Sequence, residues 1–94
     1  MASSSVERAL IEVHRRLAKA REDLTVLDEQ LLVLADAADE ARVRSLVADT
    51  PMATHEHTDA QRHADAASRA RAALVATIAS LEQRQDELLG RLVL

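Results

Sequence analysis

Residues 6–41 read VERALIEVHRRLAKAREDLTVLDEQLLVLADAADEA, and apolar side chains recur along this stretch at alternating short spacings. One set of positions repeats every seven residues, at Leu10, Leu17, Leu24, Leu31 and Ala38. A second set repeats in the interleaved register, at Val6, Val13, Ala20, Leu27, Leu34 and Ala41. These are the a and d positions of a coiled coil, because such a repeat places both sets on one side of an α-helix. The stretch therefore predicts one long helix with a narrow apolar seam.

A weaker form of the same repeat fills the second half of the chain. Its d positions are Ala53, Ala60, Ala67, Leu74, Leu81 and Leu88, and its a positions are His57, Ala64, Arg71, Ile78, Gln85 and Leu92. The break between the halves is Asp49-Thr50-Pro51, since the residue before a proline avoids the helical conformation and proline favours the first helical position. We predict a first helix over about 5–48, a hinge at 49–50 and a second helix over about 51–93. One of Ser3, Ser4 and Ser5 would cap the first helix, with Glu7 in its first turn.

A rival start for the second helix is a capping box formed by Thr58 and Gln61, which would leave residues 49–57 as a loop. The tight hinge is preferred because it aligns the two seams. It brings Leu10 opposite Leu88, Leu17 opposite Leu81 and Leu24 opposite Leu74. We therefore predict an all-α protein, a single domain over residues 1–94 that forms an antiparallel coiled-coil helical hairpin. Alanine dominates the seam near the hinge and buries less area than leucine, so the hinge half should be the softer half.

A second apolar face lies beside the seam on both predicted helices. Two helices bury only one stripe each, which makes an isolated hairpin a marginal fold. Burial of the second face against another copy would form a four-helix bundle, and burial against a different protein would form a regulator–target complex. We expect a homodimer, with an unidentified protein partner as the other possibility. The residues of this face are Ile11, Thr25, Leu32, Ala35, Ala72, Val75, Ala79 and Leu89.

Composition narrows the classes of function. The net charge of −4 and the absence of aromatic residues argue against binding nucleic acid. No stretch approaches the roughly 18 apolar residues of a membrane-spanning helix. Met1 is not followed by the apolar core of a signal peptide, so we expect a cytoplasmic protein. Lys19 is the only lysine among the 12 basic residues, a bias associated with GC-rich bacterial genomes. No catalytic or cofactor motif is present, so we expect neither enzyme activity nor a cofactor.

Two polar groups in the second predicted helix could bind a ligand. His55, Asp59 and His63 follow one another at helical spacing, and imidazole and carboxylate groups on one helix face can ligate zinc or nickel. The alternative is a solvated helix face. His57, Arg71 and Gln85 occupy seam positions, where polar residues commonly set the register of a coiled coil. Arg71 could instead bind an anionic nucleotide, together with Arg62 and Arg69.

These features predict a non-catalytic coiled-coil module for protein–protein interaction, a small bacterial regulatory or adaptor protein that acts as a homodimer. The alternative is a ligand-sensing helical bundle that binds a metal ion or an anionic nucleotide through the His/Asp or Arg cluster.

Overall fold

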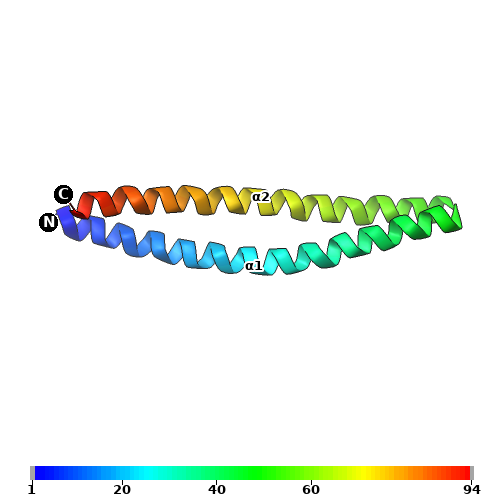
Figure 1. The fold of residues 1–94 in the computed structure, drawn as a ribbon, viewed down its shortest axis with the longest axis horizontal. Helices are drawn as coiled ribbons and strands as arrows, with labels where there is room; N and C mark the ends of the chain where they lie inside the picture. The colour runs from blue at the N-terminus through cyan, green and yellow to red at the C-terminus, as the bar shows by residue number, and fades with distance from the viewer. Residues whose placement is uncertain (1, 94) are drawn as a thin grey trace. The chain divides into compact units, whose positions relative to one another are not determined.

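The computed structural model describes residues 2–93, which form two α-helices and no strand. Helix α1 spans Ala2–Ala48 and helix α2 spans Pro51–Val93, so only Asp49 and Thr50 lie between them (Figure 1). The chain is therefore an all-α helical hairpin, as the two heptad patterns predicted.

The hinge is closed by one backbone turn and one side-chain cap. Asp49 adopts a left-handed conformation with a φ of 51°, and its N–H donates to the carbonyl oxygen of Ser45 at 3.1 Å. This is a common way to end a helix, and aspartate tolerates the conformation better than most residues. Thr50 is the N-cap of α2, because its Oγ1 accepts a hydrogen bond from the backbone N–H of Ala53 at 3.2 Å.

The rival start of the second helix at Thr58 is wrong. Helix α2 already begins at Pro51, and Thr58 lies inside it. The Thr58 hydroxyl donates to the carbonyl oxygen of Thr54 at 3.1 Å, the usual bond of a threonine in the middle of a helix. Proline supplies the required φ at the first helical position and has no N–H to leave unpaired, which explains the earlier start.

Helix α1 begins earlier than predicted. It starts at Ala2, so the serines at positions 3–5 lie within the helix and not before it. Its first turn accordingly contains no acidic residue, and Glu7 lies beyond that turn. Serine has a slightly lower helix propensity than alanine, a difference of only a few tenths of a kcal/mol per residue, so the helix can extend through them.

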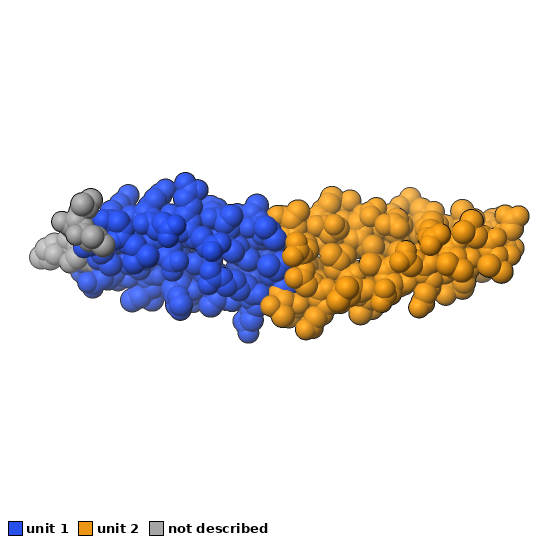
Figure 2. Space-filling model, in the orientation of Figure 1, with its two compact units in different colours: residues 1–24, 73–94 blue, residues 25–72 orange. Residues whose placement is uncertain are grey.

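The structure divides into two compact units, which are described separately (Figure 2). Unit 1 comprises Met1–Leu24 and Ala73–Leu94, and unit 2 comprises Thr25–Ala72. Unit 1 holds the cluster of large buried side chains. Leu17 and Leu88 are only 1% exposed and pack with Val13. Around this cluster lie partly buried residues of both helices: Val6, Ala9, Leu10, Ile78 and Leu81.

Unit 2 has a core of small side chains. Each of its buried residues is an alanine, namely Ala38, Ala41, Ala53, Ala64 and Ala67. The seam leucines of this unit, Leu27, Leu31 and Leu34, are only half-buried. Because methyl side chains bury little apolar area, unit 2 gains less from its seam than unit 1.

The burial pattern confirms the predicted seam. Every buried residue of the described chain occupies an a or d position of the two repeats, and the other predicted seam positions are half-buried with one exception. The exception is Leu92, which is exposed. It lies in the last turn of α2, where fewer neighbours cover a side chain.

Interhelical charges agree in part with the predicted register, which would bring Arg21 near Glu82 and Arg44 near Glu56. Arg21 and Glu82 in unit 1 form this ion pair, with 3.5 Å between Nη2 and Oε2. Arg44 pairs with Glu40 of its own helix, at 3.9 Å, and not with Glu56. Exposed pairs of this kind contribute about 0.2–1 kcal/mol, so the apolar seam determines the pairing of the helices.

Candidate interaction surfaces

The predicted second apolar face is exposed in both units. In unit 1, Ile11 is 69% exposed and Val75 is 41% exposed. In unit 2, Leu32 is 69% exposed. The remaining members of the face are also exposed: Thr25, Ala35 and Ala72 in unit 2, and Ala79 and Leu89 in unit 1. Binding of a partner that covers these large apolar side chains would be stabilised by about 25 cal/mol per Å² of apolar surface removed from water.

Two residues of this face in unit 2, Leu32 and Ala35, lie beside an ion pair between the two helices. Arg71 donates from Nε to Oδ1 of Asp28 at 2.5 Å, and both side chains are a little under half exposed. The pair borders a hollow of about 350 Å³, also lined by Leu31, Leu32 and Ala35. At this seam position the charge of the Arg71 guanidinium is therefore neutralised by the carboxylate of Asp28 on the opposite helix.

The register that aligns the two seams in the sequence also places Leu27 opposite Arg71, and it does not identify Asp28 as the partner of this arginine. The sequence did hold a sign of this contact. Asp28 directly follows Leu27 and so borders the seam, where its carboxylate is within reach of a long side chain on the opposite helix. The other two polar seam residues, His57 and Gln85, are half-buried.

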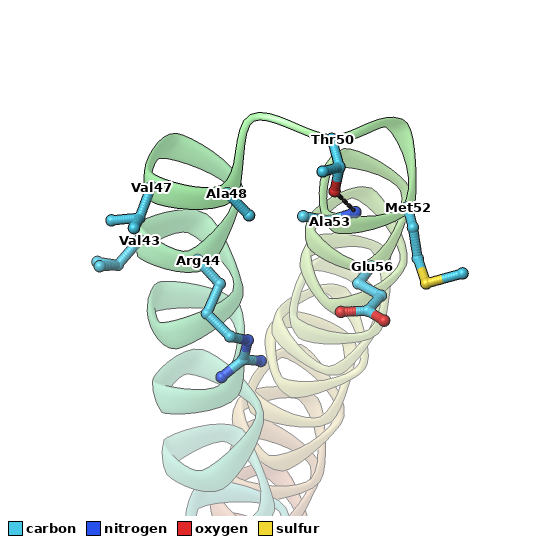
Figure 3. A pocket seen from close by; sticks show the side chains of 8 residues that line it. All are labelled: Val43, Arg44, Val47, Ala48, Thr50, Met52, Ala53 and Glu56. Carbon is cyan, nitrogen blue, oxygen red and sulfur yellow. Dashed lines mark hydrogen bonds between the residues drawn. The ribbon is translucent and has the colours of Figure 1, made fainter.

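Unit 2 also exposes large apolar side chains that the predicted face did not include. They are Val26, Val33, Val43, Leu46 and Val47 of α1 and Met52 of α2. Beside the hinge, some of them line an open hollow of about 400 Å³ (Figure 3). Arg44 projects from α1 and Glu56 from α2 along the walls of this hollow. The interior of unit 2 is therefore made of small residues, and much of its apolar bulk lies on its surface.

The predicted metal-binding group is only partly assembled. His55 Nε2 lies 3.2 Å from Asp59 Oδ2, and the other oxygen of Asp59 lies 3.7 Å from Nη1 of Arg62. Within residues 2–93, no three histidine, cysteine or acidic side chains are placed to hold a metal ion, so His63 does not join the pair. Zinc or nickel binding by His55, Asp59 and His63 stays a prediction, which a thermal shift with either metal would test.

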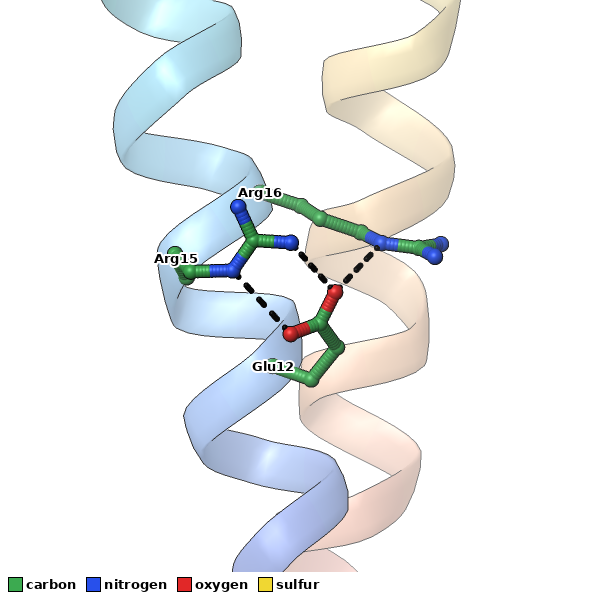
Figure 4. Close-up of polar contacts among 3 residues, drawn as sticks. All are labelled: Glu12, Arg15 and Arg16. Atoms are coloured by element: carbon green, nitrogen blue, oxygen red, sulfur yellow. Dashed lines mark hydrogen bonds and ion pairs between the residues drawn. The ribbon is translucent and has the colours of Figure 1, made fainter.

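A charged network occupies the surface of α1 in unit 1 (Figure 4). Arg15 donates to both carboxylate oxygens of Glu12, at 2.6 and 3.1 Å, and Nε of Arg16 donates to Oε1 at 3.1 Å. The hydrogen bonds from Arg15, and after them the one from Arg16, hold the pKa of Glu12 below its ordinary value. The side chains of Arg15 and Arg16 are mostly exposed and that of Glu12 is a little under half exposed, so the network lies on the helix surface.

Neither α1 nor α2, over the part that the structure describes, has the length and apolar character that crossing a membrane requires. Comparisons with protein families, with curated proteins and with solved structures give no match to this chain.

Proposed function

We propose that this chain is a non-catalytic helical-hairpin module for protein–protein interaction, a small bacterial regulatory or adaptor protein that acts in the cytoplasm as a homodimer. It works without a cofactor and without nucleic acid. The observation that carries this proposal is the exposure of large apolar side chains outside the seam, Leu32 and Ile11 above all.

The exposure of the second apolar face supports a partner that covers it. Such a partner would remove from water the side chains of Ile11, Leu32 and Val75, which are 69%, 69% and 41% exposed. Two hairpins that bury their second apolar faces against each other would form a four-helix bundle.

The test is the molar mass of the protein and of two charge-insertion variants, measured by size-exclusion chromatography with light scattering. Leu32→Glu and Val75→Glu would each place an unpaired carboxylate in the dimer contact. Each variant should shift the protein toward monomer and lower its melting temperature, and the melting temperature of the wild type should rise with protein concentration.

Ala73→Glu is the matched control, since Ala73 is exposed and lies two residues before Val75 on α2, on the side of the helix turned away from the face. A glutamate at an exposed position outside any contact changes stability by less than about 0.5 kcal/mol. If Leu32→Glu and Val75→Glu keep the molar mass and melting temperature of the Ala73→Glu control, the face is not a dimer contact.

A further inference from the structure

A second periodic stripe runs along the outer side of α1 in unit 2. Its residues follow one another at alternating spacings of three and four, so they lie on one side of the helix, away from the seam. All of them are exposed. We call this set the outer stripe, and its members are Val26, Glu29, Val33, Asp36, Glu40, Val43 and Val47.

The valines give the outer stripe an apolar character that a solvated helix does not need. Val33 is 68% exposed and Val47 is 82% exposed. Two open hollows adjoin the stripe, each of about 400 Å³. One is lined by Glu29, Gln30, Val33 and Leu34. The other is the hollow beside the hinge that Val43 and Val47 line (Figure 3). A hollow beside exposed apolar side chains can accommodate a side chain of a partner helix.

The charges among the valines of the outer stripe are negative, at Glu29, Asp36 and Glu40. One basic residue, Arg44, borders the stripe one turn after Glu40. Within residues 2–93, Glu29 and Asp36 have no ion-pair partner, and Glu40 reaches only Arg44, at 3.9 Å. A partner that covers the valines must therefore also meet three carboxylates.

A second copy of the chain does not suit this surface. If the outer stripes of two chains paired in parallel, each carboxylate would face the same carboxylate of the other chain. If they paired antiparallel about their centre, Asp36 would face its counterpart and Val33 would face Glu40. Like charges opposed across an interface cost several kcal/mol, and a carboxylate against a valine loses water without gaining a partner.

We propose that the outer stripe docks a basic amphipathic helix of another protein, with valines against its apolar face and Glu29, Asp36 and Glu40 against flanking lysines or arginines. The stripe is about 32 Å long at 1.5 Å per residue, which matches a partner helix of about three heptads. The stripe shares no residue with the proposed dimer face, but Leu32 of that face lies one turn from both Glu29 and Asp36 on α1. The molar mass of each variant is therefore measured together with its peptide affinity, so that a loss of docking is distinguished from a loss of dimerisation.

The experiment measures binding of synthetic peptides to the full chain by fluorescence anisotropy. The basic probe is a helix of three heptads, roughly 21 residues, with leucine and alanine at the seam positions and arginine at the flanking positions. The acidic probe has glutamate in place of each arginine. The basic probe should bind, more weakly as salt is added, and the acidic probe should not.

Variants locate the contact. Glu29→Lys/Asp36→Lys/Glu40→Lys should weaken binding of the basic probe by at least about tenfold, because three attractive contacts become repulsive. The matched control reverses three carboxylates elsewhere, Glu7→Lys/Asp65→Lys/Asp86→Lys, which changes the net charge equally. This control should retain most of the affinity if the contact lies on the outer stripe.

The apolar contact is tested by Val33→Ser/Val47→Ser, which should weaken binding by about fivefold or more while the helix content seen by circular dichroism is kept. The proposal is overturned if the basic probe does not bind, if the acidic probe binds equally well, or if the two charge variants lose affinity equally. A lower molar mass of the serine variant would assign the stripe to a second copy and would also overturn it.

Discussion

Replacing Leu17 by alanine tests the packing of unit 1 most directly. Leu17 is 1% exposed and belongs to the cluster that contains Leu88 and Val13. The substitution removes three carbon atoms from the seam and leaves the helix propensity of α1 high, because alanine is the best helix former.

The expected loss follows from the burial. Three buried carbon atoms at about 0.8 kcal/mol each contribute about 2.4 kcal/mol of transfer free energy. The remaining cavity adds a further amount, limited because two helices can move together or admit water. We expect a loss of about 2.5–3.5 kcal/mol, within the range of about 2–5 kcal/mol for buried leucines. A chain of 94 residues has a total stability of about 5–14 kcal/mol, so this loss is large.

The comparison variant is Leu34→Ala, the same chemical change at a seam position of unit 2. Leu34 is only half-buried and its unit has an alanine core. The loss there should be about half as large, near 1–1.5 kcal/mol. The assay is urea denaturation followed by circular dichroism at one protein concentration, since dimerisation would couple stability to concentration. Equal losses for the two variants, or a loss below about 1 kcal/mol for Leu17→Ala, would refute the difference between the units.

Three further predictions concern the hinge and the surface of α1. Thr50→Ala should lower stability by about 1 kcal/mol in urea denaturation, because it removes the acceptor for the Ala53 N–H, whereas Thr50→Ser should not. Asp49→Gly should raise the melting temperature and Asp49→Val should lower it, since only glycine adopts a positive φ without strain, and the reverse order would contradict the turn. The pKa of Glu12 in the folded protein lies below its ordinary value of 4.5. The ionised Glu12 therefore stabilises the fold above that value, and this contribution disappears as the pH falls through the lower folded pKa. An acid titration of stability should show a shallower decline for Glu12→Gln, and identical curves would rule out the contribution.

The sequence predicts the helices and the seam because both depend on local periodicity. A seven-residue repeat places apolar side chains on one side of a helix whatever they later contact, so Leu17, Ala41 and Leu88 could be assigned to the core from spacing alone. The hinge could be located at Pro51 because proline restricts its own backbone and that of Thr50. Hydrophobic spacing also identified Leu32 and Val75 as exposed apolar residues, and the structure leaves both in water.

Other features depend on long side chains and on the pairing of the helices. Arg71 could be placed in the seam from its heptad position, but its contact with Asp28 required the two helices to be brought together, since a flexible arginine can reach several neighbours. The outer stripe is periodic in the sequence, and the structure shows that all four of its valines are exposed on the side of α1 away from the seam.

The amino-acid sequence by itself determined the two helices, the two-residue hinge and the residues that form the seam, because period, proline and capping act over a few neighbouring positions. Only the tertiary structure decided how deeply each seam side chain is buried, so that Leu17 and Leu88 of unit 1 are 1% exposed whereas Leu27, Leu31 and Leu34 of unit 2 are only half-buried. Burial depends on how many atoms of the opposite helix surround a side chain. That number follows from the pairing of residues far apart in the chain, such as Leu17 with Leu88, and no local pattern contains it.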